Sequence, residues 1–284
     1  MKNKWEVIMT KGKKIAKLVL VVIFFILLLL SITGCTKKDE GESLREKVHE
    51  EIHYLEAALL QIANHLNNIE LSDSKVSEQT MNLESKETAK QGEGEEDGSS
   101  SQSENMIKYE ATPNVVIGND RNPDWQSLKK DIELLSESWA TAVLDLYQIG
   151  IPEDQIIGFS NDLNVVITNI NAENKIDSLN NVAKLYNYLP NYLNNFLGDQ
   201  EDVQLVYTKA YLVSAYTLIE QENWDGIRDN LNKAEESYTK MLHTEQNKNK
   251  GYILLKEFQN AVDMQNKDVL YVKYKNAMEE MNVL

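Results

Sequence analysis

The chain has 284 residues, with 29 Lys and Arg against 45 Asp and Glu, four His and one Cys. The net charge of −16 argues against nucleic acid as a partner, because phosphates require a basic surface. The single Cys excludes an internal disulfide and a Cys-based zinc site, and the four His leave little room for His-based catalysis.

The first 34 residues are predicted to be a signal peptide. Residues 1–17 contain six Lys against one Glu, and the fifteen residues from Leu18 to Ile32 are apolar apart from Ser31. This order, followed by small residues, is typical of a secretory signal. Fifteen apolar residues span about 22 Å as a helix, which is short for a ~30 Å hydrocarbon core. A permanent transmembrane helix would therefore need help from its flanks.

The segment Ile32-Thr33-Gly34-Cys35 resembles the lipobox of bacterial lipoproteins. The resemblance implies that a diacylglycerol is attached to Cys35 and that the signal is cut before this residue. It also implies that acyl chains hold the mature protein at the extracytoplasmic face of the bacterial cell membrane. The alternative is an uncleaved signal anchor with an incidental Cys.

Residues 44–70 are predicted to form an amphipathic helix after a short tether at 35–43. Apolar residues recur at alternating intervals of four and three, which is typical of a helix that packs along one stripe against another helix. The stripe consists of Val48, Ile52, Leu55, Leu59, Ile62, Leu66 and Ile69. Its partner can be the rest of the chain or a second copy, which would make the protein a coiled-coil homo-oligomer.

Residues 71–121 are predicted to be a disordered acidic linker that ends in an irregular lead-in at 111–121. The segment 92–105 reads GEGEEDGSSSQSEN and contains no apolar residue. Such a segment buries too little surface to offset the entropy of ordering it. As a flexible coil the linker would span about 40 Å, so helix 44–70 could reach any face of the body.

Residues 122–284 are predicted to be an α-helical domain, and the fold class is all-α. Apolar residues at helical spacing mark helices near 125–146, 156–170, 179–189, 203–217, 224–241, 255–262 and 270–281. No convincing run alternates apolar and polar residues, so strands are not expected. The pattern predicts a helical-hairpin bundle or a short repeat-like array.

Turn residues define the expected helix ends in this domain. Asn122-Pro123-Asp124 supplies an N-cap, a proline for the first turn and an acidic residue at the positive end of the helix. Gly150 and Pro152 are expected to end that helix, and Pro190 to stop or kink the third. Residues 192–197 are predicted to be a short turn.

One stretch resembles a tetratricopeptide repeat over roughly 35 residues. The resemblance rests on Ala215-Tyr216, Asn223-Trp224-Asp225-Gly226-Ile227 and Ala234. It implies two closely packed helices with an aromatic residue opening the second. The spacing departs by about two positions from the repeat pattern, and the usual Gly and closing Pro are absent. We therefore expect repeat-like hairpins rather than a repeat array.

The sequence HEEIH at 49–53 matches the H-E-x-x-H signature of zinc metalloproteases. On a helix His49 and His53 share one face, and Glu50 beside them could act as a general base. The extended motif is missing, because Leu59 stands where a third His would be, and the expected fold lacks strands to build a cleft. The sequence thus predicts no catalytic residue. A metal patch helped by His65 or a carboxylate, and a zinc hydrolase, are the alternatives.

Tyrosine is abundant, with 13 Tyr against 5 Phe. An aromatic ring with a hydrogen-bonding hydroxyl suits a binding groove or a partner interface. The residues predicted for such a groove are Tyr186, Tyr188, Tyr192, Tyr207, Tyr211 and Tyr216. The alternative is that they line the seam between two hairpins, with their hydroxyls at the surface.

Together these features predict a membrane-anchored extracytoplasmic lipoprotein with a non-catalytic α-helical binding domain. The expected partners are the membrane, through the lipid, and an envelope protein or polymer. No cofactor is expected. The alternatives are the zinc-dependent hydrolase or metal-binding protein at His49 and His53, and self-association through residues 44–70.

Overall fold

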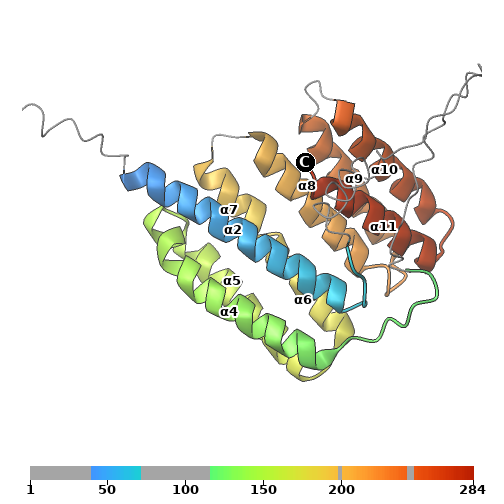
Figure 1. Ribbon diagram of the computed structural model, residues 1–284, viewed down its shortest axis with the longest axis horizontal. Coiled ribbons are helices and arrows are strands. Elements are labelled where there is room, and N and C mark those ends of the chain that lie inside the picture. The colour runs from blue at the N-terminus through green and yellow to red at the C-terminus, as the bar shows by residue number, and fades with distance from the viewer. Residues whose placement is uncertain (1–39, 72–115, 198–199, 242–245) are drawn as a thin grey trace, which may run out of the picture. The chain divides into compact units, whose positions relative to one another are not determined.

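The computed structural model describes residues 40–71, 116–197, 200–241 and 246–284 (Figure 1). The predicted signal peptide, Cys35 and most of the predicted linker lie outside these residues. The described residues form helices and turns, and none of them is in a strand. The prediction of an all-α fold is therefore confirmed.

The helices follow one another through short connections from α4 onward. Their bounds are α2 Glu40–His65, α4 Trp125–Gln148, α5 Glu153–Asn171, α6 Lys175–Tyr186, α7 Leu189–Phe196, α8 Gln200–Thr217, α9 Trp224–Met241, α10 Gln246–Val262 and α11 Lys267–Met281. The chain divides into two units, Met1–Glu46 and Lys47–Leu284, with the boundary inside α2. All contacts described below lie within the second unit.

Helix α4 begins one residue after Asp124, which is its N-cap. The Asp124 carboxylate accepts hydrogen bonds from the backbone N–H groups of Gln126 and Ser127, at 3.0 and 3.3 Å. The prediction that Asn122 is the cap is therefore wrong by two residues. Asp124 is the cap because its carboxylate satisfies two of the N–H groups that have no intrahelical partner at the start of the helix. After α4, Gly150 adopts a φ of +92°, as expected for a glycine that ends a helix.

Residues 192–196 are helical, which corrects the prediction of a short turn at 192–197. They belong to α7, where Pro190 occupies the first turn. Proline is tolerated at that position because the first N–H groups of a helix have no intrahelical partner. Pro190 therefore starts a new helix instead of ending structure. Leu189, Tyr192, Leu193 and Phe196 of α7 are buried.

Helix α8 is at the centre of the packing within this unit. Neighbours along the chain pack together in the pairs α4–α5, α5–α6, α8–α9, α9–α10 and α10–α11. Helix α8 also contacts α6, α7 and α11. A residue on α8 can therefore meet side chains from several helices.

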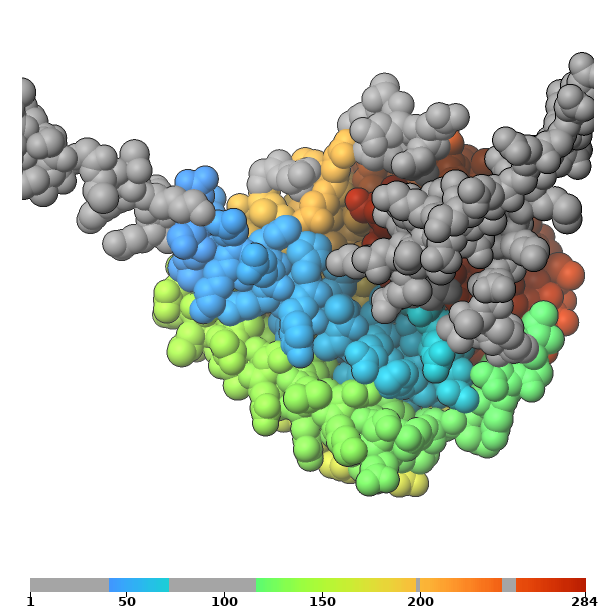
Figure 2. Space-filling model, in the orientation of Figure 1, coloured from blue at the N-terminus to red at the C-terminus, as the bar shows by residue number. Residues whose placement is uncertain are grey.

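From Lys47 onward, α2 lies antiparallel along α4 (Figures 1 and 2). Near its start, Lys47 Nζ lies 2.5 Å from the carboxylate of Asp145, close to the end of α4. At its end, His65 Nδ1 lies 2.8 Å from the carboxylate of Asp131, near the start of α4. Two pairs at opposite ends fix the direction of α2 along α4.

The helix ends at His65 and not at residue 70. Asn68, with a φ of 50°, forms the turn that follows. The N–H of Ile69 bonds to Asn64 O and that of Asn68 to His65 O, at 3.0 and 3.1 Å. This pattern is a Schellman motif, which turns the chain and satisfies the last carbonyl groups of the helix. It also directs Ile69 into the core, where it is buried.

All seven residues of the predicted apolar stripe are buried against the chain's own helices. Buried polar contacts add to the docking of α2. Tyr216 on α8 donates to Ala63 O at 3.1 Å, and Tyr274 on α11 donates to Asn64 Oδ1 at 3.1 Å. Pairing of this stripe with a second copy would require α2 to leave the unit.

We expect Leu59→Ala to lower the free energy of unfolding by about 2–5 kcal/mol, because it removes buried methyl groups and leaves a cavity. Leu59 is 0% exposed, whereas Leu144 on α4 is 66% exposed. Leu144→Ala is thus a matched control, with an expected change below about 0.5 kcal/mol. Urea unfolding followed by circular dichroism measures both. Equal losses in the two variants would contradict the docked position of α2.

Candidate functional site

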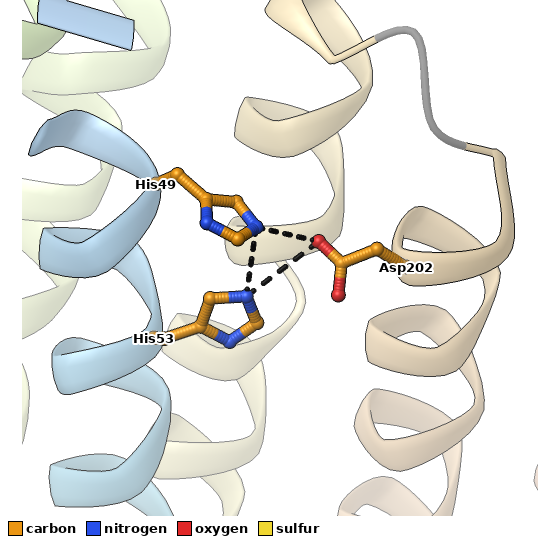
Figure 3. A group of neighbouring side chains, drawn as sticks. All are labelled: His49, His53 and Asp202. Atoms are coloured by element: carbon orange, nitrogen blue, oxygen red, sulfur yellow. Dashed lines mark hydrogen bonds and ion pairs between the residues drawn. The ribbon is translucent and has the colours of Figure 1, made fainter. Parts of the chain in front are cut away.

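Two His of α2 and one Asp of α8 converge on a single point (Figure 3). His49 Nε2 lies 2.8 Å from Asp202 Oδ2. The Nε2 atoms of His49 and His53 are 3.1 Å apart. His53 Nε2 lies 3.5 Å from the same Asp202 oxygen. Three potential ligand atoms therefore form a small triangle between two helices.

The sequence places each member of this cluster for a simple reason. His49 and His53 are four residues apart, which puts them on one face of α2. The buried neighbours Val48 and Ile52 fix the rotation of α2, so the two imidazoles lie at the border of its apolar stripe. Asp202 is in the first turn of α8, where a carboxylate is stabilised by the positive end of the helix.

A second group of polar residues contacts the other ring nitrogen of His53, Nδ1. His53 Nδ1 lies 2.9 Å from Glu56 Oε2, and the Glu56 side chain is buried. The other oxygen of Glu56 lies 3.1 Å from Lys209 Nζ and accepts a hydrogen bond from the Tyr186 hydroxyl at 2.8 Å. Because an ionised carboxylate only accepts, His53 Nδ1 donates to it. Its Nε2 consequently faces His49 and Asp202.

The electrostatics of the cluster favour the ionised carboxylates. Hydrogen bonds to Asp202 and Glu56 raise the pKa of His53 to about 9, although burial opposes this. Burial acts to raise the pKa of Asp202, but the hydrogen bonds from His53 and His49 prevail and lower it to about 2. Burial likewise opposes ionisation of Glu56, yet its bond with His53 and the charge of Lys209 hold its pKa below the ordinary value.

His65 and the motif glutamate Glu50 lie apart from this cluster. His65 pairs with Asp131, and Glu50 is exposed. Among the described residues, the group able to hold a metal ion consists of His49, His53 and Asp202. The helical spacing revealed the His pair. Asp202, Glu56 and Lys209 were missed, since Asp202 and Lys209 come from α8, and Glu56 is marked only by its spacing of three from His53.

The six tyrosines of the predicted groove do not line one surface. Tyr186, Tyr192 and Tyr216 are fully buried, so they cannot line a groove. The alternative of surface hydroxyls is also wrong for Tyr186 and Tyr216, because their hydroxyls bond to Glu56 Oε1 and Ala63 O inside the unit. The buried carboxylate and carbonyl groups of α2 require donors, and these hydroxyls supply them.

The remaining three tyrosines of the predicted groove keep some exposed surface. Tyr188 donates to Asp162 at 2.8 Å. The rings of Tyr207 and Tyr211 on α8 stack with their centroids 6.2 Å apart. The ammonium group of Lys233 lies 5.9 Å from the centroid of the Tyr211 ring. Tyr207 and Tyr211 are therefore the part of the predicted groove that a partner could reach together.

Comparisons with known proteins found no match among protein-family models, curated proteins or solved structures. Within the described ranges, no helix is both long enough and apolar enough to cross a membrane. The apolar segment 18–32 lies outside those ranges.

We expect Asp202→Asn to lower the pKa of His53 from about 9 toward 6.5, because Asp202 is the largest cause of the shift. NMR titration of the imidazole in metal-free protein measures the change. The matched control is Asp131→Asn, which removes the carboxylate beside His65 and should leave the pKa of His53 unchanged. An unchanged pKa in Asp202→Asn would contradict the geometry of the cluster.

The raised pKa of His53 also determines how the stability of the fold changes with pH. The folded pKa of His53 is above its ordinary value of 6.5. Its charge therefore stabilises the fold fully below pH 6.5, and this contribution is lost as the pH rises through about 9. The groups that face His53 are Asp202 and His49, with Glu56 linking it to Lys209. Asp202→Asn should reduce the loss of folding stability between about pH 6.5 and 9.

Proposed function

We propose that the protein is a lipid-anchored protein of the extracytoplasmic face of a bacterial membrane and that its helical unit is a non-catalytic binding module. The observation that carries the proposal is the order of basic residues, apolar segment and Ile32-Thr33-Gly34-Cys35. The only Cys of the chain occupies the position that lipid attachment requires. Helix α2 begins at Glu40, five positions after Cys35, so the predicted attachment point is close to the first described helix in the sequence.

The composition supports a membrane anchor made of lipid instead of surface charge. The chain is acidic, and removal of residues 1–34 with their six Lys would make it more so. Anionic headgroups repel such a chain, so acyl chains on Cys35 would have to supply the membrane affinity. Two or three chains suffice for stable anchoring, whereas one alone gives marginal binding.

A metal-dependent hydrolase is the second candidate, favoured by the meeting of His49, His53 and Asp202. Hydrolysis would also require a general base beside a metal-bound water. Glu50 is the residue of the motif that would supply it, but it is exposed and does not belong to the cluster. The arrangement thus supports binding better than catalysis.

We expect the wild-type chain to incorporate an alkyne-labelled fatty acid in cells and Cys35→Ala to incorporate none, since the thiol is the attachment point. Gel fluorescence after coupling of the alkyne to a dye measures the label. Thr36→Ala, one residue after Cys35, is the matched control and should keep the label. An unlabelled wild-type protein, or a labelled Cys35→Ala variant, would disprove the anchor.

The binding role is tested by crosslinking in cells. A photoreactive phenylalanine analogue at position 207 or 211 should capture one dominant envelope protein or polymer, because these rings are partly exposed side by side on α8. The same analogue at Tyr147, which is exposed on α4, is the control and should not capture it. Mass spectrometry identifies the product. Equal products from all three positions, or none, would argue against a binding surface at Tyr207 and Tyr211.

A further inference from the structure

We propose that His49, His53 and Asp202 bind one divalent transition-metal ion of the Zn²⁺ type, which cross-links α2 to α8. The inference goes beyond the proposed lipid anchor and does not depend on it. It rests on the mutual geometry of the three ligand atoms, on the buried carboxylate behind His53, and on the access of solvent to the cluster.

The spacing of the three atoms suits a small metal ion. They are separated by 2.8, 3.1 and 3.5 Å. Tetrahedral ligands at the usual zinc distances of about 2.0–2.1 Å lie about 3.3 Å from one another. An ion at that distance from all three atoms would sit about 0.9 Å from their plane. The side chains would therefore need only small adjustments.

The two contacts of His49 Nε2 cannot both be hydrogen bonds. The Nε2 atom of His49 faces both Asp202 Oδ2 and His53 Nε2. A ring nitrogen carries either one proton or one lone pair. Only one of these two contacts can then be a straight hydrogen bond. A cation between the three atoms would interact favourably with all of them.

Glu56 holds His53 in the orientation that metal binding requires. Metal-bound imidazoles typically donate their second N–H to a carboxylate, which fixes the tautomer and makes the ligand more basic. His53 Nδ1 and Glu56 Oε2 form this contact at 2.9 Å. Glu56 is only 4% exposed and is held by Lys209 and Tyr186. The orientation of His53 is thus built into the core.

The cluster is accessible and leaves room for a further ligand. The side chains of His49, His53 and Asp202 are 36%, 34% and 23% exposed. An ion can therefore enter from solvent without opening the unit. Three protein ligands leave a fourth tetrahedral position for water or for an external group.

The ligand set selects the class of metal. Two imidazole nitrogens suit Zn²⁺ and neighbouring transition metals. Ca²⁺ takes six to eight oxygen ligands, and Mg²⁺ prefers an octahedral oxygen shell. One carboxylate and two imidazoles do not meet either requirement. We therefore expect Zn²⁺ to bind and Ca²⁺ and Mg²⁺ not to bind.

Isothermal titration of the full-length chain in detergent with ZnCl₂ tests the site. We expect one equivalent to bind to the wild type. His53→Gln and Asp202→Asn should each weaken binding at least tenfold, because each removes a ligand. Glu56→Gln should weaken it about 10-fold or more through the orientation of His53. Asp131→Asn, which alters the other His–Asp pair between α2 and a neighbouring helix, should bind as the wild type does.

Two measurements on the wild type remain decisive if a variant fails to fold. A hundredfold excess of Zn²⁺ over its Kd should raise the unfolding midpoint by about 5–11 °C. One equivalent of Zn²⁺ should also shift the imidazole NMR signals of His49 and His53 and leave those of His65 in place. The proposal is overturned if the folded wild type binds no stoichiometric Zn²⁺, or if Asp202→Asn and Asp131→Asn have the same effect.

Discussion

The burial of one apolar stripe on α2 is the constraint on which the candidate site depends. The stripe fixes the rotation of α2 within the unit, and ion pairs with Asp131 and Asp145 fix its direction along α4. Once the rotation is set, His49 and His53 can face only the neighbouring start of α8. The polar cluster is therefore a consequence of apolar packing, and the hydrogen bonds refine a position that burial has already determined.

Much of the fold follows from local sequence patterns, and the errors have both local and long-range causes. Helical spacing and turn residues were enough to predict the helices other than α7, because amphipathic periodicity is visible within each segment. The short helix α7 was missed because Pro190 reads as a stop, although it fits a first helical turn. The burial of the Tyr186 and Tyr216 hydroxyls was also missed, since their partners Glu56 and Ala63 lie 130 and 153 residues away.

The candidate site was predictable only in part, for the same physical reason. Two His at a spacing of four share a helix face in any sequence, so half of the cluster was visible. Asp202 lies 153 residues beyond His49, and the register between α2 and α8 decides that they meet. Glu56 follows Leu55 of the apolar stripe, but nothing in the local sequence indicates that its carboxylate is buried. Its burial becomes understandable only when Lys209 and Tyr186 of other helices are placed beside it.

The position of the cluster along α2 would give a bound metal ion a specific structural role. The chain connects α2 to the rest of the unit through its C-terminal end at His65, where the Schellman turn and Asp131 hold it. The opposite end has no such covalent connection to α4 or α8. His49 and His53 lie just after the boundary between the two units at Glu46 and Lys47. A cross-link to Asp202 would therefore hold α2 where the chain itself holds it least. The metal would close the long loop of chain between His53 and Asp202, and cross-links that close long loops give the largest stabilisation in theory.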